Sequence, residues 1–390
     1  MNIIELPFTL FGPLFYNGIF LGLWLLWFMY NSKEDGSPLR TKFTTCLKNP
    51  LWFYLITSGF IILFLFLLLS YAIQNTDVDD AITSGVQAFL AGSNPYKEEV
   101  VEHHLPSGII YGFYHYFPPD LLSYSIFYLL GGSLLVSILA TYWFVPFHFI
   151  LLIPSYWFVS RIVAWPNGRR LPFFGLLVSP FLFTNSILML FFFLIGYYLY
   201  EIQERHNLGM TFYVLAASIK YMVGFIVLFY LIEKLRLFPK EGLSTSKWTY
   251  IRTNFGPYFL SGITLAIFSL PFGLIDVIIA VFFYQGLLSF RSEVAQSQGP
   301  LLIELIRWGT LDTLYIGIVV IILIGAFFIV RNQSTYSQIL HFSFLAMIIL
   351  PFYATELFIT VPFYWWFKEG QDVIIEEWNV SDQKTFKSPP

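Results

Sequence analysis

The chain alternates long apolar runs with short polar stretches, and this pattern predicts a bundle of membrane-spanning helices. A helix needs about 20 consecutive apolar residues to cross the hydrocarbon core of a bilayer. Runs that meet or approach this length lie at 8–30, 51–73, 120–141, 143–160, 186–200, 221–236, 254–273, 313–330 and 337–355. Shorter runs at 171–184 and 208–219 are also expected to be buried. The pattern therefore predicts an all-α polytopic membrane protein with about 10–11 transmembrane helices.

Composition supports this fold class. The 390 residues are 57% hydrophobic and 12% charged, and 45 of them are phenylalanine. Soluble domains carry about twice that fraction of charge, so this chain cannot hide its apolar surface in a water-soluble core. The net charge of −3 says little about partners, and no nucleic-acid partner is expected. Cys46 is the sole cysteine, which excludes an internal disulfide.

The distribution of basic residues predicts the orientation of the loops. Lysine and arginine concentrate in the cytoplasmic loops of membrane proteins. The loops 31–50 and 233–252 are rich in both, so we expect them in the cytoplasm. The segment 75–120 holds one basic residue, Lys97, and seven acids, so it is expected outside.

This orientation raises one difficulty between Pro119 and Arg161. Arg161 also looks cytoplasmic, so the chain must cross the membrane an odd number of times between these residues. Two apolar runs lie there. We therefore expect one of them to lie flat at the interface or to re-enter the membrane.

These assignments divide the chain into one membrane domain, 1–367, and a polar C-terminal tail, 368–390. The outer face is predicted to carry a first loop, 75–119, and a second loop, 274–312, which includes an interfacial helix. Any chemistry is expected in these loops and in the helix ends near them.

An acidic cluster follows directly on the apolar run 51–73. It consists of Asp77, Asp79 and Asp80. Acids are common in the first turn of a helix because they complement its dipole, and a solvated helix start is one interpretation. The other is a carboxylate that acts as a general base, or a pair that binds a metal ion. His103, His104 and His115 share the loop, but they lack the spacing of a typical ligand pair, so no cofactor is assigned and a divalent metal is not favoured.

Polar and aromatic residues elsewhere in the first loop, and Lys220, each allow a structural and a functional interpretation. "GSNPY", ending at Tyr96, is a turn by composition. In "YGFYHYFPPD" the rings of Tyr114, His115 and Tyr116 suit either an interfacial aromatic belt or a sugar-binding surface. Lys220, alone between two apolar runs, either snorkels to the interface or binds a lipid phosphate.

The second outer loop holds a further candidate. Arg291 opens it, and Gln298 follows within a glutamine-containing stretch. These residues are either part of a solvated loop or a phosphate site, in which a guanidinium binds in bidentate fashion.

The order of these pieces resembles the GT-C superfamily of polytopic membrane glycosyltransferases. An acid follows an early helix, then come "GSNPY", an aromatic-Pro-Pro element, "FTNSI" with Asn185, and a lone lysine. The chain is most similar to the prokaryotic enzymes that take mannose from a polyprenyl-phosphate carrier. Lys220 is followed here by Tyr221, where that branch has proline.

The resemblance implies a function for each candidate residue. A sugar, mannose or another hexose, would pass with inversion from a polyprenyl-phosphate donor to a lipid, glycan or protein acceptor at the outer face of a prokaryotic cell membrane. The implied catalytic residues are Asp77, Asp79 and Asp80. The implied phosphate ligands are Lys220 and Arg291. The implied sugar or acceptor ligands are Tyr96, Tyr114, His115, Tyr116, Asn185 and Gln298.

Two other functions remain open from the sequence. A membrane transporter of a small solute or lipid-linked sugar would carry paired charges and broken helices in matching halves, and no such symmetry is evident. A non-catalytic scaffold with the same fold would keep the residues without turnover.

Overall fold

The structure, a computed structural model, is described here for part of the chain. The described residues are 51, 54–55, 58–59, 62, 77–105, 108–162, 171, 174–175, 178, 185–220, 223–236, 247–284, 324–325, 327–328 and 338. This part is mostly helical, as the apolar runs predict, with one small β-hairpin. The predicted runs at 8–30 and 337–355 and the polar tail lie outside it.

Helices account for most of the apolar runs that fall in the described part. The α-helices are α4 (Asp77–Leu90), α5 (Pro118–Phe127), α6 (Ser133–Leu139), α7 (Val145–Ile162), α9 (Ser186–Tyr197), α10 (His206–Ile219), α11 (Gly224–Arg236), α12 (Lys247–Ser269) and α13 (Leu274–Ile278). Short π-helical turns are η2 (Tyr128–Gly132), η4 (Tyr198–Ile202) and η7 (Ile279–Tyr284), and 3₁₀ turns are η3 (Ala140–Tyr142) and η6 (Leu270–Phe272). The helices predicted at 143–160, 186–200, 208–219 and 221–236 are confirmed as α7, α9, α10 and α11.

Among the described residues, three helical segments are long and apolar enough to cross a membrane. They are Pro118–Leu139, Val145–Ile162 and Trp248–Phe272. Large apolar side chains are also exposed on them, for example Ile153 on α7 and Phe259 on α12. Such side chains are unfavourable in water and fit the hydrocarbon of a bilayer. These findings fit a membrane protein.

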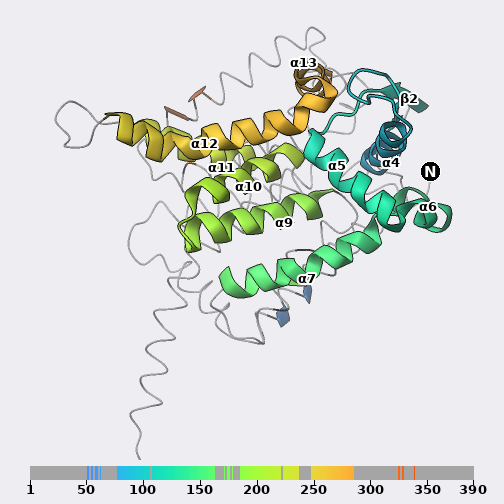
Figure 1. The fold of residues 1–390 in the computed structure, drawn as a ribbon. Coiled ribbons are helices and arrows are strands. Elements are labelled where there is room, and N and C mark those ends of the chain that lie inside the picture. The colour runs from blue at the N-terminus through green and yellow to red at the C-terminus, as the bar shows by residue number, and fades with distance from the viewer. Residues whose placement is uncertain are drawn as a thin grey trace, which may run out of the picture.

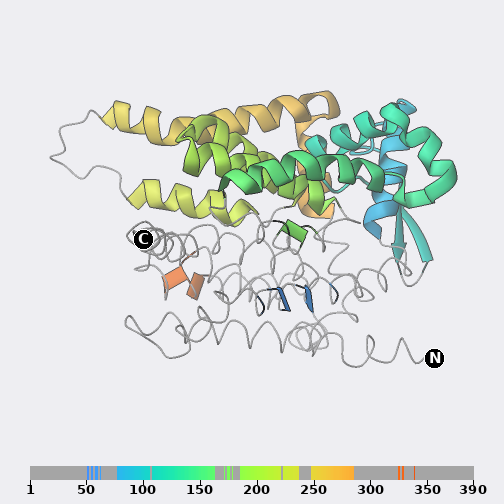
Figure 2. The same ribbon diagram turned by 90° about the horizontal axis from the view of Figure 1, so that it is seen from below.

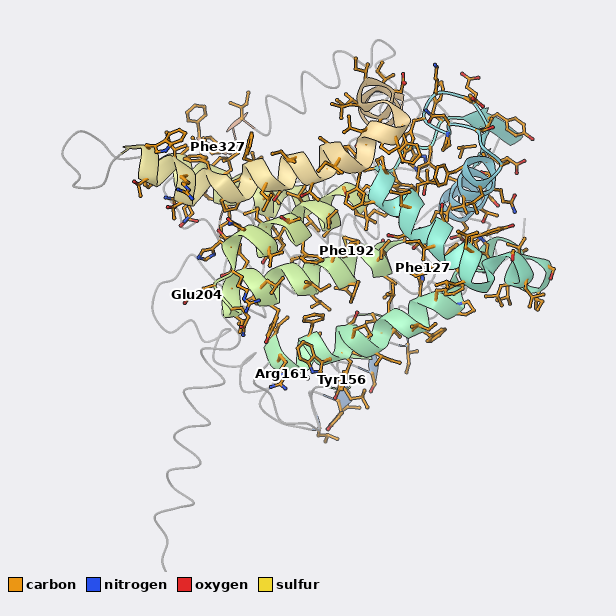
Figure 3. All side chains as sticks on the ribbon, in the orientation of Figure 1. Phe127, Tyr156, Arg161, Phe192, Glu204 and Phe327 are labelled. Atoms are coloured by element: carbon orange, nitrogen blue, oxygen red, sulfur yellow. The ribbon has the colours of Figure 1, made fainter. Side chains whose placement is uncertain are left out.

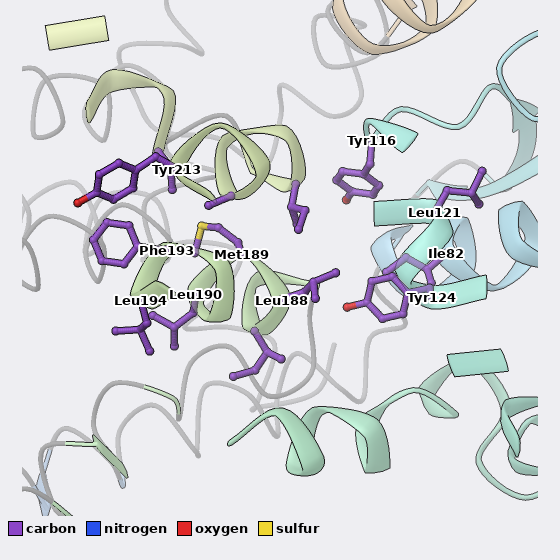
Figure 4. Close-up of a cluster of buried hydrophobic side chains, with 14 of the residues drawn as sticks. Ile82, Tyr116, Leu121, Tyr124, Leu188, Met189, Leu190, Phe193, Leu194 and Tyr213 are labelled. Carbon is purple, nitrogen blue, oxygen red and sulfur yellow. The ribbon is translucent and has the colours of Figure 1, made fainter. Parts of the chain in front are cut away.

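The long helices α7, α9, α10 and α12 run side by side and form the body of the described part (Figure 1). In this bundle α9 packs against both α7 and α10, and α10 packs against α11 and α12. Aromatic side chains fill the space between them: the rings of Phe193 and Tyr213 lie 5.7 Å apart between α9 and α10 (Figure 4). The other end of this core contains Ile82, Leu121 and Tyr124, from α4 and α5.

The segment Pro118–Leu139 turns back instead of continuing through the bundle. The backbone is kinked at Gly131, whose φ of 141° is a left-handed conformation that glycine adopts readily. After the kink, α6 leads to Trp143, whose indole Nε1 donates a hydrogen bond to Thr83 Oγ1 on α4 at 3.1 Å. Both ends of the segment therefore lie near α4, at one end of the bundle (Figures 1 and 2). Whether one of the two apolar runs before Arg161 re-enters the membrane or lies flat stays a prediction.

The described part of the segment predicted as the first outer loop forms a folded cap on that end of the bundle. Strands β1 (Val101–Leu105) and β2 (Gly108–Gly112) pair antiparallel, with Val101 opposite Gly112 and Leu105 opposite Gly108. The backbone N–H of Glu102 donates to Ser84 Oγ at 2.9 Å, which attaches the hairpin to α4.

"GSNPY" forms the turn that its composition predicts, and Asn94 gives that turn a long-range contact. Asn94 Oδ1 accepts a hydrogen bond from the backbone N–H of Tyr96 at 3.1 Å. Its Nδ2 donates to the backbone oxygen of Phe272 at 2.8 Å. The turn is therefore attached to the end of α12, beside the point where α13 begins the predicted surface helix.

Candidate functional site

Two of the three acids of α4 are buried. Asp79 and Asp80 are 1% and 6% exposed. Asp77 opens the helix, but its side chain lies outside the described part. This burial excludes a solvated helix start for Asp79 and Asp80. Buried carboxylates need hydrogen-bond or charge partners, which a surface acid does not.

A corner of the chain between α6 and α7 holds these acids in place. Thr83 Oγ1 accepts a hydrogen bond from Trp143 and donates to the backbone oxygen of Asp79 at 2.7 Å. The hydroxyl of Tyr142 donates a hydrogen bond to the Asp79 carboxylate. Burial, together with the charges of Asp79 and Asp80, raises the pKa of Tyr142 to about 12, so its hydroxyl keeps its proton and acts as a donor.

Asp120 is the centre of a second buried network at the same end of the bundle. It lies in the first turn of α5, directly after two prolines, and is fully buried. Its Oδ2 accepts a hydrogen bond from the hydroxyl of Tyr114 at 2.5 Å, and its Oδ1 accepts one from Asn185 Nδ2 at 3.1 Å. Burial, with the nearby Asp120 charge, raises the pKa of Tyr114 well above its usual value, so the phenol is a stable donor.

Asn185 presents a buried acceptor atom to the site. It is fully buried at the N-cap position of α9, and its side chain makes no capping hydrogen bond to that helix. Because the carboxylate of Asp120 requires a donor, the amide nitrogen faces Asp120 and the amide oxygen faces away. Within the described ranges no group hydrogen-bonds to this Oδ1. A buried amide oxygen usually has a partner, so a ligand donor such as a hydroxyl group would satisfy it.

Lys220 is directed into the site. It follows the last residue of α10 and is 5% exposed. Its Nζ lies 5.3 Å from the centre of the Tyr116 ring, which is the geometry of a cation–π contact. It also interacts electrostatically with the Asp120 carboxylate. A snorkelling lysine would extend to the interface, so burial favours the functional interpretation of Lys220.

Aromatic side chains form one wall of this network. The rings of His115 and Tyr116 are 4.2 Å apart, and both residues are buried. The hydroxyl of Tyr96 donates to the backbone oxygen of Tyr116 at 2.8 Å, and its ring packs edge-on against Tyr114. Tyr96 therefore helps to hold Tyr114 and Tyr116 in position. Direct contact of these rings with a sugar stays a prediction.

Tyr124 lies between the two acidic groups. It is one turn along α5 from Asp120, and it interacts electrostatically with both Asp120 and Asp79. Its hydroxyl pairs with His148 Nε2 on α7 at 2.8 Å, and both side chains are fully buried. The acids of α4 and the Asp120 network are thus parts of one polar region.

Sequence reasoning found most of this region and missed Asp120. The structure brings together Asp79, Asp80, Tyr114, His115, Tyr116, Asn185 and Lys220. The available signal for Asp120 was its place as the first acid after Pro118-Pro119, at the start of a helix. Arg291 and Gln298 lie outside the described residues, as do the side chains of His103 and His104. The described residues contain no group of three or more His, Cys, Asp or Glu arranged to hold a metal ion.

Known proteins do not identify this site. No protein-family model matches the chain, and no curated protein or solved structure matches it. The chemistry must therefore be inferred from the residues. The region combines buried carboxylates, a buried ammonium group and a buried amide oxygen, all beside long apolar helices. Such a set can bind a polar, hydroxylated group at the surface of a membrane, remove a proton from it and stabilise an anion.

Proposed function

We propose that this protein is an inverting glycosyltransferase of the membrane, which moves a hexose from a polyprenyl-phosphate donor to a hydroxyl acceptor. The observation that supports it most is the convergence of Asp79, Asp80 and the Asp120–Asn185–Lys220 network at one end of the apolar helices. We propose the outer face for the site, because the acidic first loop forms its cap, and a prokaryotic membrane, because the chain resembles prokaryotic enzymes.

The reaction needs a base for the acceptor. A carboxylate of the α4 cluster, Asp79 or Asp80 or the preceding Asp77, would take the proton of the acceptor hydroxyl. The hydroxyl oxygen would then attack the anomeric carbon from the face opposite the phosphate. The bond from that carbon to the phosphate oxygen would break, and the phosphate would leave with the electron pair.

The leaving phosphate needs positive charge. Lys220 supplies one ammonium group, and Arg291 of the second loop is proposed as a second cation. Asp120 acts as a positioning residue, since its carboxylate attracts the ammonium group of Lys220. Asn185 Oδ1 would accept a hydrogen bond from a hydroxyl group of the sugar.

The experiment is a transfer assay with purified protein in lipid nanodiscs. Labelled mannose on a synthetic polyprenyl phosphate is the donor, and a total lipid and glycan extract supplies acceptors. Wild type is compared with Asp77→Asn, Asp79→Asn and Asp80→Asn, each verified for monodispersity. Ser123→Ala is a matched control, because it removes a part-buried hydroxyl of α5. Among the described residues this hydroxyl bonds only to the backbone oxygen of Pro119.

We expect wild type and Ser123→Ala to transfer mannose and one of the three asparagine variants to lose transfer. Equal activity in all three variants would exclude a base in α4. Movement of a solute or of intact lipid-linked sugar across proteoliposomes, without transfer, would instead favour a transporter. Absence of both activities with every hexose donor would favour a non-catalytic scaffold.

A further inference from the structure

An apolar groove begins beside the acids of α4. It lies at the corner between α6 and α7, has a volume of about 480 Å³ and falls in the usual size range of ligand sites, about 300–1,000 Å³. Its lining residues are Leu139, Tyr142, Val145, Pro146 and Phe149. None of these side chains carries a charge, so the groove suits a hydrocarbon chain.

Tyr142 connects this groove to the acidic cluster. Its ring lines the groove, and its hydroxyl donates to the carboxylate of Asp79. The other wall residues Val145, Pro146 and Phe149 lie along the first turns of α7, one of the helices long enough to cross a membrane. The groove therefore runs from the residue that hydrogen-bonds Asp79 along the start of a membrane helix, which suits an amphiphile whose polar end points toward the acids.

Charge decides which amphiphile fits. A lipid phosphate beside Asp79 and Asp80 would be repelled by carboxylates. A neutral hydroxyl group would instead donate a hydrogen bond to them. Lys220, which suits the phosphate, belongs to the other part of the polar region, beside Tyr116 and Asp120.

We propose that this groove binds the apolar chain of a neutral lipid acceptor, whose hydroxyl group then lies beside Asp79 and Asp80. The inference rests on the proposed function and deepens it, because it selects a lipid from among lipid, glycan and protein acceptors. The donor's isoprenoid chain and an ordinary membrane phospholipid are the competing occupants, and the experiment separates them.

The first measurement is photolabelling, which does not require turnover. The probe is a dodecyl glucoside with a diazirine in the alkyl chain, added to the full-length protein in phosphatidylcholine nanodiscs. We expect labelled peptides to map to 139–149 and labelling to be displaced by unlabelled dodecyl glucoside. Displacement by undecaprenyl phosphate at equal concentration would assign the groove to the donor and overturn the inference. Labelling that no dodecyl glucoside displaces would mean that bulk lipid fills the groove, which also overturns it.

Variants of the groove make the test specific. Val145→Phe adds a ring to the wall and should lower labelling of 139–149 about tenfold, which corresponds to 1.4 kcal/mol. Ile153→Phe is the matched control, because it lies on the same helix with a 75% exposed side chain that does not line the groove. If Val145→Phe is not monodisperse, Leu139→Phe fills the groove from the other side. Unchanged labelling in a folded variant would contradict the proposal.

A transfer assay then separates this inference from the proposed reaction. Dodecyl mannoside and methyl mannoside are compared as acceptors, with labelled polyprenyl-phosphate-mannose as donor. We expect transfer to the dodecyl compound to exceed transfer to the methyl compound, and Val145→Phe to remove that difference. Equal transfer to both acceptors in wild type would overturn the lipid acceptor and leave the glycosyltransferase standing. Displaceable labelling without any transfer would leave the groove as a site for a neutral lipid and overturn the sugar transfer alone.

Discussion

At the scale of single residues, Asp120 is held by two donors from distant parts of the sequence. Tyr114 reaches it from the loop before α5, and Asn185 reaches it from the start of α9. Asn185 is 65 positions away along the chain, so this contact depends on the tertiary fold. Because both donors are buried, the network has little freedom to rearrange when one group changes.

Asp120→Asn should therefore destabilise the protein. An asparagine side chain offers one oxygen and one NH₂ group, so one of the two donors would face another donor. A buried hydrogen-bonding group left without its partner costs about 1–3 kcal/mol, and we expect a loss of this size. The measurement is thermal unfolding in detergent, with Ser123→Ala as the control on the same helix. An unchanged unfolding temperature for Asp120→Asn would show that the network contributes nothing to stability.

The buried charge of Lys220 leads to a separate prediction about catalysis. Lys220→Met keeps the length of the side chain but removes the ammonium group beside Asp120 and Tyr116. Loss of one group that stabilises developing negative charge typically lowers the catalytic rate about 10²–10³-fold, and we expect this effect on transfer. Lys220→Arg should recover part of the rate, because it restores the charge with a different shape. Full activity in Lys220→Met would remove Lys220 from the phosphate site.

The sequence predicted some of these residues and not others, for a physical reason. Asp79, Asp80 and Lys220 stand out because charges next to apolar runs are costly without a role. Asp120 does not stand out, because an acid in the first turn of a helix is ordinary and its burial depends on Tyr114 and Asn185. The hydrogen bond from the Tyr96 hydroxyl to the Tyr116 backbone could not be predicted, because the two residues meet only in the folded chain.

At the scale of secondary-structure elements, the contact between α4 and the loop before α5 depends on Gly85. A Cβ atom at this position would overlap the ring of Tyr114, which is fully buried and bonded to Asp120. The absence of a side chain at Gly85 therefore allows α4, which carries the acids, to pack against the Asp120 network.

Gly85→Ala should push α4 away from Tyr114 and the Asp120 network. The added methyl must displace Tyr114 or shift α4, and overpacking of this kind typically costs about 1–3 kcal/mol. Gly262→Ala on α12 is the matched control, since a Cβ there meets nothing within 4 Å and the change to alanine favours a helix. We expect Gly85→Ala alone to lower the unfolding temperature. If both variants unfold like wild type, α4 and Tyr114 do not pack as described.

Hydropathy predicts the ends of helices less well than their presence. The apolar run at 254–273 predicts a helix that begins near residue 254, but α12 begins at Lys247. Helical hydrogen bonds continue into the polar flank because "KWTYIRTN" contains no residue that breaks a helix, whereas hydropathy marks only the part that suits lipid. The β-hairpin was not predicted, since "VEHHL" and "GIIYG" are too short to show a period.

At the scale of the whole molecule, α9, η4 and α10 form a hairpin that begins and ends at the site. Asn185 precedes α9 and hydrogen-bonds to Asp120, and Lys220 follows α10 and interacts electrostatically with Asp120. The descending arm, Ser186–Ile202, has 17 residues, which gives a length of about 25 Å at 1.5 Å per residue. This is shorter than the hydrocarbon core of a bilayer, which is about 30 Å thick, so the arm covers most of that distance and we expect the turn at 203–205 near the opposite interface. Figure 3 shows Glu204, in this turn, and Arg161, at the end of α7, on the far side of the bundle from Phe127.

This geometry predicts opposite accessibility for two exposed positions. Lys97 lies in the cap over the site, and Arg205 lies in the distant turn. In a Cys46→Ser background, which removes the sole native cysteine, a membrane-impermeant maleimide should label Lys97→Cys in intact cells. It should label Arg205→Cys only after permeabilisation, because the turn would face the cytoplasm. Labelling of both positions from outside would mean that the hairpin does not cross the membrane. The reverse pattern would place the acids and Lys220 at the cytoplasmic face, where a donor with its phosphate at the outer surface could not reach them.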